Sequence, residues 1–208
     1  MAVYAIGGNR PRIHPSSFVH PLASVAGRVE IGPECYIGPG ASLRGDWVII
    51  RLGAGSNVQD SCTVHGAPGT EVRLEEGTHL GHGCTVHGAH LAPNVLVGMH
   101  AVVLDGVELG EGCVIGSGCV VPAGLVVPGG KLVVGVPGRI VGDVRPGLAA
   151  FKGEGTGWYR QMAGRVLADF EAVALEECLT EGAGTAAGAE GVGVTRWSPW
   201  LDELTPQE

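Results

Sequence analysis

An aliphatic residue recurs at every sixth position along most of this 208-residue chain. The series comprises Ile13, Val19, Val25, Ile31, Ile37 and Leu43, then Leu52, Val58 and Val64, then Leu74, Leu80 and Val86, and finally Leu91, Val97, Val103, Leu109, Ile115, Val121 and Val127. A helix repeats every 3.6 residues and a half-buried strand every two, so neither explains a period of six. This period is typical of a parallel β-helix, in which three short faces make one triangular coil of about 18 residues. The sequence therefore predicts an all-β fold of stacked coils.

Five of the six cysteines keep a fixed place in this repeat. Each follows a repeat residue by four positions: Cys35, Cys62, Cys84, Cys113 and Cys119. In other repeats this position holds Ser, Ala, Val or Thr, which marks it as the small position that points inward. A zinc or disulfide cluster is the alternative, but the sequence contains no Cys-x-x-Cys motif. We interpret these cysteines as small buried residues, which free cysteine often is.

Charge and hydropathy argue against two classes of partner. The net charge of −8 and the pI near 5.4 argue against a nucleic-acid-binding protein, which needs clustered Lys and Arg. The first residues, MAVYAIGGNRPRIHP, lack the basic region and apolar run of a signal peptide. No apolar run approaches the roughly 20 residues of a membrane helix. We therefore expect a cytoplasmic protein with neither nucleic acid nor membrane as partner.

The pattern divides the chain into three parts. Residues 10–140 are predicted to form the β-helix, and residues 141–180 a linker and a C-terminal helix that packs on it. Within the second part, residues 158–179 predict an amphipathic helix. Its apolar side chains would be Met162, Val166, Phe170 and Val173, at steps of three and four. Residues 181–208 are rich in Gly and Ala in their first half and are predicted to be a flexible tail.

The spacing of the repeat assigns residues to faces of the prism. The step from Leu43 to Leu52 has nine residues and the step from Val64 to Leu74 has ten, and we treat the extra residues as loops at corners. By this count Leu43, Val64 and Val86 share one face, called face A. Face B contains Leu52 and Leu74, and face C contains Val58 and Leu80.

Three histidines in this frame predict a metal site. His65 and His87 follow face-A residues by one position, as Arg44 does, so the three form an outward column on successive coils. Two imidazoles one strand spacing apart can bind one zinc ion at about 2.0–2.1 Å. His82 follows Leu80 by two positions and stacks above Asp60 on face C, from which it cannot reach the other two histidines.

The third ligand is therefore predicted to come from a neighbouring chain. A contact between face C of one chain and face A of the next is heterologous and closes into a ring, for which a triangular prism favours three members. The same contact would bring Arg44 near the partner's Asp60 and place Gln59 near the metal. Three imidazoles and an open position form the catalytic zinc pattern, which lowers the pKa of a bound water toward about 7. The alternative is that these are ordinary surface histidines, as we interpret His14, His20, His79, His90 and His100.

The motifs around these residues resemble a known family. SLRGDWV, NVQDSCTVHG, HLGHGCTVHG and VLVGMHAVVLDGVELGEGCVIGSGCVV are similar to the gamma-class carbonic anhydrase-like proteins, above all to the branch from phenylacetic acid degradation and carnitine operons. The likeness covers about residues 10–145. It implies a left-handed parallel β-helix and a homotrimer with zinc, iron or cobalt between subunits. The metal ligands would be His65, His82 and His87, with Arg44, Asp46, Asn57, Gln59 and Asp60 as interface and supporting residues.

The chain departs from the founding anhydrases of that family at several positions. Trp47 stands where they have Glu, and their long acidic loop is reduced to GAPGTEVR, with Glu71. Tyr159 matches a tyrosine of the branch, whereas Gly155 stands where an Asn is expected. Because fast CO2 hydration requires proton export from the metal site, these changes predict a lower turnover.

Four functions are compatible with these features. The resemblance implies reversible hydration of CO2 by a metal-bound hydroxide, with Gln59, Asn57, Arg44 and Asp60 as the catalytic residues. The same site suits hydrolysis of an acyl-CoA thioester or an accessory role in aromatic acid catabolism. An acyltransferase is the third function, although it usually needs one His base and no metal. A non-enzymatic role in assembly is the fourth, because a fold alone fixes no activity.

Overall fold

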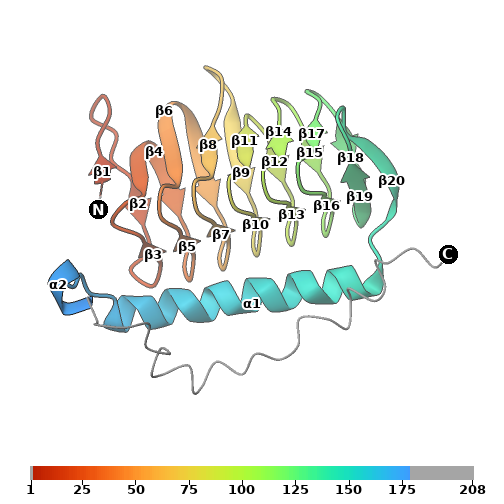
Figure 1. Ribbon diagram of the computed structural model, residues 1–208. Helices are drawn as coiled ribbons and strands as arrows, with labels where there is room; N and C mark the ends of the chain where they lie inside the picture. Colours follow the sequence, from red (N-terminus) through yellow and green to blue (C-terminus); the bar gives the residue numbers. More distant parts are fainter. Residues whose placement is uncertain (1, 179–208) are drawn as a thin grey trace. The chain divides into compact units, whose positions relative to one another are not determined.

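The computed structural model describes residues 2–178 and confirms the predicted fold class. The chain winds into a parallel β-helix of hexapeptide repeats and continues into a C-terminal helix (Figure 1). It divides into two compact units, Met1–Ala168 and Asp169–Glu208, and the β-helix belongs to the first. The predicted tail, residues 181–208, lies outside the described residues. The second unit contains helix α2, Leu175–Cys178.

The three faces are stacks of short strands. Face A consists of β1 (Ala2–Tyr4), the first part of β4 (Ser24–Ile31), the first part of β6 (Ser42–Leu52), β8 (Thr63–His65), β11 (Thr85–His87), β14 (Val102–Val103) and β17 (Val120–Val121). Face B consists of β2 (Arg12–Ile13), the later parts of β4 and β6, β9 (Glu71–Leu74), β12 (His90–Leu91), β15 (Glu108–Leu109) and β18 (Val126–Val127). Face C consists of β3 (Phe18–Val19), β5 (Tyr36–Ile37), β7 (Asn57–Val58), β10 (His79–Leu80), β13 (Leu96–Val97), β16 (Val114–Ile115) and β19 (Lys131–Val134).

The register confirms the face assignment made from the repeat. Leu43 pairs with Val64, and Val64 pairs with Val86, on face A. Leu52 pairs with Leu74 on face B. Val58 pairs with Leu80 on face C. The count of sixes therefore gives the correct neighbours in space across both irregular steps.

The repeat residues form the interior of the β-helix. From Val19 to Val127 all of them are buried, none more than 4% exposed. Because burying one Val, Ile or Leu side chain stabilises a fold by about 1.5–3 kcal/mol, this column is the main source of stability. The five cysteines of the repeat are also buried and free, which confirms that they fill the interior.

The burial of these thiols leads to a labelling prediction. Burial raises the pKa of the Cys35 thiol to about 11, so thiolate is scarce at this position. In contrast, Cys178 is exposed. We expect iodoacetamide at pH 8 to alkylate Cys178 in the native protein and all six cysteines in guanidinium, as read by peptide mass spectrometry. Native labelling of Cys35 at the rate of Cys178 would contradict this packing.

The two irregular steps have different structures. The residues between Val64 and Leu74 form a turn in which the Thr70 N–H donates to the Ala67 carbonyl, as predicted. The residues between Leu43 and Leu52 are not a loop, because β6 continues across the corner from face A to face B. Gly27 permits this path, since a Cβ there would lie 2.3 Å from the Gly45 carbonyl oxygen. The prediction of a corner loop at this step is therefore wrong.

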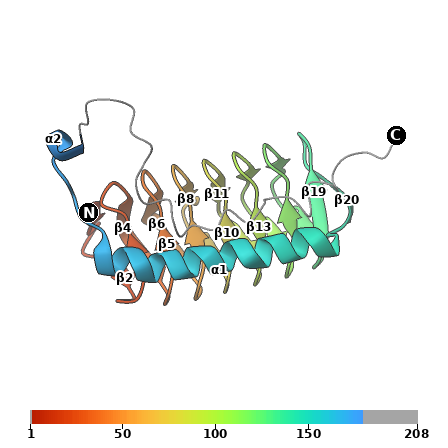
Figure 2. The same cartoon turned by 60° about the horizontal axis from the view of Figure 1, so that its bottom comes forward.

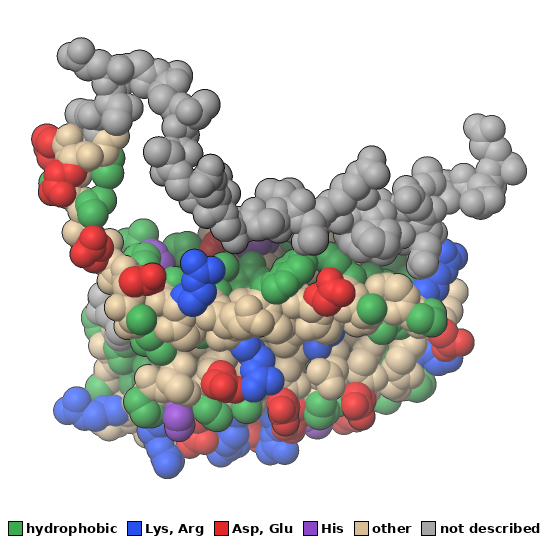
Figure 3. Space-filling view, turned by 90° about the horizontal axis from the view of Figure 1, so that it is seen from below, with side chains coloured by type: hydrophobic (Ala, Val, Ile, Leu, Met, Phe, Trp, Pro, Cys, Tyr) green, Lys and Arg blue, Asp and Glu red, His purple; other side chains and the backbone are tan. Residues whose placement is uncertain are grey.

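The C-terminal helix α1, Pro146–Asp169, begins earlier than predicted and lies along face C (Figures 1 and 2). Its buried residues are Lys152, Gly155, Thr156 and Ala163. The predicted apolar face is wrong, because Met162, Phe170 and Val173 are 41%, 48% and 55% exposed. The helix packs closely through small side chains and through Lys152, whose buried ammonium group donates hydrogen bonds to the Gly77 carbonyl and to Asn94 Oδ1. A search for large apolar residues misses this pattern. Figure 3 views the molecule from the side of α1 and shows hydrophobic side chains on this surface.

Within residues 2–178 the structure has no helix long and apolar enough to cross a membrane.

Candidate metal centre

His65 and His87 lie side by side on face A. They are register partners at the ends of β8 and β11, and their ring centroids are 5.3 Å apart. The Nδ1 atom of His65 is 3.3 Å from Nε2 of His87. Two nitrogens that bind one zinc ion at about 2.0–2.1 Å with tetrahedral angles are also roughly 3.3 Å apart. The spacing of this imidazole pair thus fits two ligands of one ion.

Each of the three histidines is held by a carboxylate. Asp46 is 2.8 Å from Nε2 of His65, and both oxygens of Asp105 are 2.8 Å from Nδ1 of His87. The Nδ1 atom of His82 is 2.8 Å from Asp60. Metal-binding histidines usually donate their second ring N–H to a carboxylate in this way. The donor set therefore fits a metal centre chemically.

The carboxylate beside His65 is held in its charged form. Its burial raises the pKa of Asp46, but hydrogen bonds from His65, the Trp47 N–H and Arg44 outweigh this effect and lower the pKa to about 2. Asp46 is thus an anion at neutral pH, and in this form it accepts the hydrogen bond that orients the His65 ring.

His82 lies on the turn after β10, directly over Asp60, as the repeat count predicts. Among residues 2–178, no three or more His, Cys, Asp or Glu side chains are grouped so that they could hold a metal within one chain. The structure therefore does not bring His82 to His65 and His87. That His82 of one chain binds the same ion as His65 and His87 of the next stays a prediction.

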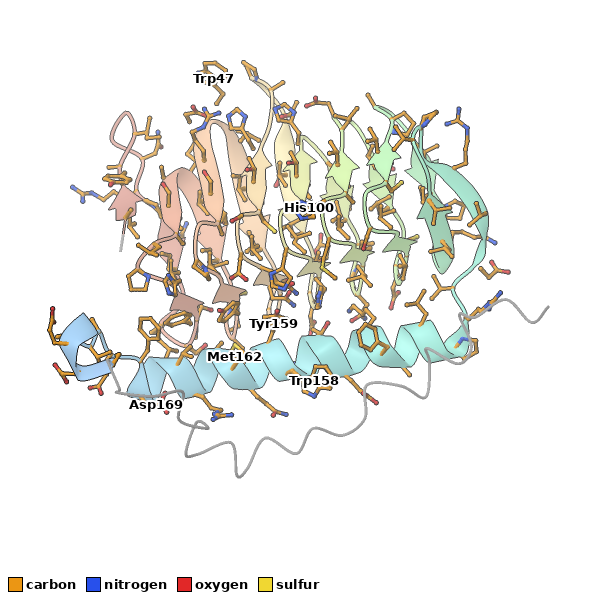
Figure 4. All side chains as sticks on the ribbon, viewed as in Figure 1. Trp47, His100, Trp158, Tyr159, Met162 and Asp169 are labelled. Atoms are coloured by element: carbon orange, nitrogen blue, oxygen red, sulfur yellow. The ribbon has the colours of Figure 1, made fainter. Side chains whose placement is uncertain are left out.

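Arg44 has a carboxylate partner within its own chain. Its guanidinium forms an ion pair with Asp46, beside the imidazole pair. The contact with the partner's Asp60 remains a prediction, because it needs a second chain. Trp47 follows Asp46 at the corner, is 58% exposed, and has its ring centroid 6.1 Å from that of His65 (Figure 4). Trp47 thus places an aromatic ring beside the His65–His87 pair.

Gln59 and Asn57 are buried beneath α1 rather than exposed at the surface. Their exposed fractions are 3% and 0%. The Nε2 atom of Gln59 is 3.1 Å from Oδ1 of Asn57 and 2.6 Å from Nε2 of His79. Gln59 is followed directly by Asp60, the partner of His82, so these amides connect the interior to the His82 turn.

Tyr159 of α1 closes this network from outside. Its ring meets His79 edge-on, with centroids 5.5 Å apart, and Figure 4 shows it between α1 and the coils. Burial, together with the charge of Asp60, raises the pKa of Tyr159 to about 12. The hydroxyl therefore stays protonated and can act as a hydrogen-bond donor near neutral pH.

Sequence reasoning missed two residues of this region. Asp105 lies one coil beyond His87, two positions after Val103, so the repeat count contains the signal that would have found it. A Cβ at Gly88 would lie 2.2 Å from Asp105 Oδ1, so Gly88 leaves room for this carboxylate. His79 was interpreted as a surface residue, which is wrong, because α1 covers it and burial lowers its pKa to about 4.

Comparison with known proteins places this fold and repeat among the hexapeptide transferases. The model of the family "Bacterial transferase hexapeptide (six repeats)" matches residues 10–45 and 88–123. The carnitine operon protein CaiE of Escherichia coli K12 is 39% identical over 165 residues, 79% of this chain and 84% of CaiE. CaiE of Salmonella agona is 40% identical over 163 residues, 78% of this chain and 82% of that protein. The chain belongs to the hexapeptide-repeat transferase family that includes CaiE.

Two solved structures show the same architecture. The BC4754 gene product of Bacillus cereus, a candidate acetyltransferase, is 29% identical with a TM-score of 0.79, over 80% of this chain and 97% of that chain. A hexapeptide transferase family protein from Anaplasma phagocytophilum is 26% identical with a TM-score of 0.75, over 78% and 96%. These findings support an enzyme of the transferase type. They leave the carbonic anhydrase class as a proposal.

Proposed function

We propose that this protein is a metalloenzyme of the carbonic anhydrase type, built as a homotrimer. His65 and His87 of one chain and the partner subunit's His82 would bind one zinc ion, with iron or cobalt as substitutes. The reaction would be the reversible hydration of CO2. The observation that carries this proposal is the 3.3 Å separation of the His65 and His87 nitrogens, in a pair flanked by Asp46 and Asp105.

The residues of the chain have separate roles in this proposal. Asp105 and Asp60 hold the proton on Nδ1 of His87 and His82, which leaves each Nε2 lone pair available as a ligand. When bound, a divalent ion supplies Lewis acidity for the activation of water. Gln59 lies next to the His82 turn and orients the attacking water by a hydrogen bond. Asn57 and Arg44 act by holding Gln59 and Asp46, respectively.

The test measures metal and activity in the same samples. Purified protein supplied with zinc or iron should hold about one ion per chain, as three ligands shared in a ring imply, and should accelerate CO2 hydration in stopped-flow assays. His65→Ala should lose both properties. His14→Ala is the matched control, because His14 is an exposed histidine whose hydrogen bond is to Ser16. A metal-free protein, or hydration that survives His65→Ala, would refute the proposal.

Acyl transfer or thioester hydrolysis is the second candidate function. The likeness to a candidate acetyltransferase at 29% identity favours it, as does the exposed aromatic Trp47 beside His65. In this function, an imidazole–carboxylate pair of the protein, such as His87 with Asp105, would act as the general base for attack on an acyl-CoA thioester. Release of free CoA from acetyl-CoA, with or without an amine acceptor, separates this function from hydration.

Asp105 provides a direct test of the proposed ligand set. Asp105→Asn keeps the size of the side chain but removes the charge that orients His87. We expect zinc affinity, measured by competition with a chromophoric chelator, to fall about 10–100-fold. Asp143→Asn, on the exposed strand β20 (Arg139–Asp143), is the control and should leave affinity unchanged. Equal affinity in wild type and Asp105→Asn would show that the charge of Asp105 does not support His87 as a ligand.

A further inference from the structure

His79 is the first residue of β10 on face C and lies against Tyr159 and Gly155 of α1. It pairs in register with Asn57 on one side and Leu96 on the other. Its ring contacts Tyr159, and its Nε2 lies 2.6 Å from Nε2 of Gln59. It belongs to neither the metal pair nor the interior of the coil.

The Gln59 amide nitrogen faces both Asn57 and His79, and this orientation sets the direction of each hydrogen bond. The Gln59 Nε2 group can only donate, so both Asn57 Oδ1 and His79 Nε2 must accept. His79 is then neutral, with its proton on Nδ1. Burial, Lys152 and His82 lower the pKa of His79 to about 4, which agrees with a neutral ring at pH 7. A protonated ring would place two donors face to face.

We propose that His79 is a positioning residue that fixes the orientation of the Gln59 amide. With its NH2 group donating to His79 and Asn57, Gln59 has its carbonyl oxygen left for the site. Gln59 therefore acts as an acceptor toward the attacking water, not as a donor. This role rests on the proposed hydration function, but the orientation of the amide does not depend on a metal.

The Nδ1 atom of His79 allows an independent test of the neutral tautomer. Its Nδ1 atom is buried and, within residues 2–178, has no hydrogen-bond partner. The nearest position on α1 is Gly155, where a Cβ would lie 3.6 Å from Cε1 and 4.0 Å from Nδ1 of His79. A short polar side chain at residue 155 could accept the Nδ1 proton and further hold the neutral tautomer.

Nuclear magnetic resonance of the metal-free protein tests the orientation. His79→Leu removes the acceptor, whereas His79→Gln offers a side-chain carbonyl in its place. We expect hydrogen exchange of the Gln59 NH2 group to become about two- to tenfold faster in His79→Leu, the range that one net hydrogen bond implies, and to recover in His79→Gln. Unchanged exchange in His79→Leu, or no recovery in His79→Gln, would overturn the proposal.

Gly155→Asn and Gly155→Ala form a matched pair of variants that tests the Nδ1 atom of His79. Both remove a helix glycine, but Asn alone adds an acceptor. Exchange of the His79 Nδ1 proton should slow in Gly155→Asn and stay at the wild-type rate in Gly155→Ala. Equal slowing in both variants would contradict an unsatisfied, protonated Nδ1.

Activity of the metal-loaded protein then separates this proposal from the proposed function. His79→Leu should lower kcat for CO2 hydration about two- to tenfold with metal content and KM unchanged. If wild type binds no metal or hydrates no CO2, the proposed function fails, while the exchange measurements still decide the role of His79. A fall in metal content in His79→Leu would instead make His79 a support of the ligand set and overturn its role through Gln59.

Discussion

Mixing His65→Ala chains with His82→Ala chains should restore about one quarter of the metal sites, although each variant alone holds none. In the proposed ring, each site uses His65 of one chain and His82 of the next. In an equal random mixture, each of these two requirements is met half of the time. A mixed trimer then always contains one intact site. The measurement is metal per chain after the two chains are unfolded together and refolded.

The controls for this experiment are the unmixed variants and a mixture of His65→Ala with His14→Ala, both carried through the same refolding. Refolding of His65→Ala alone should give no metal. Its mixture with His14→Ala should give about one half of the sites, because His82 is intact in both chain types whereas His65 is intact in only one of them. A mixture of the two site variants that stays metal-free, while both refold to trimers, would show that the three histidines do not share a site between chains.

The second large effect is on stability. Leu80 is fully buried between its register partners Val58 and Val97 in the column of face C. Leu80→Ala should lower the free energy of unfolding by about 2–5 kcal/mol, since a close-packed coil cannot collapse onto the cavity. Guanidinium unfolding followed by far-ultraviolet circular dichroism, at one fixed protein concentration, measures the change.

Leu22→Ala is the matched control for this substitution. Leu22 is 74% exposed, so the same change of side chain should alter stability by less than about 0.5 kcal/mol. Equal effects at the two positions would contradict the assignment of residue 80 to the interior of the coil.

The sequence predicts the coils well because one period decides both burial and register. The repeat residue of each hexad points inward, so counting by six places Val58 under Leu80 and Asp60 under His82. The position of His87 over His65 follows from the same count. The site geometry that could be predicted is therefore the part that the strands themselves carry.

Other parts of the site depend on contacts that no period describes. Helix α1 buries Lys152, Gly155 and Ala163, which do not form an apolar stripe, so its inner face could not be found from hydrophobic spacing. His79 was misread for the same reason, because its environment is created by α1. The continuous strand β6 depends on the close crossing of Gly27 and Gly45, which only the three-dimensional path reveals.

Within residues 2–178, the last strand runs opposite to the strands of the stack. β20 (Arg139–Asp143) pairs antiparallel with β19, with a register shift between Leu132 and Val133. All five of its residues are exposed. An open coil end would offer a ready template for a further chain to add in parallel, and growth by that route would give fibres. Because β20 runs backward with an irregular register, this end does not present a parallel hexapeptide edge to a further chain.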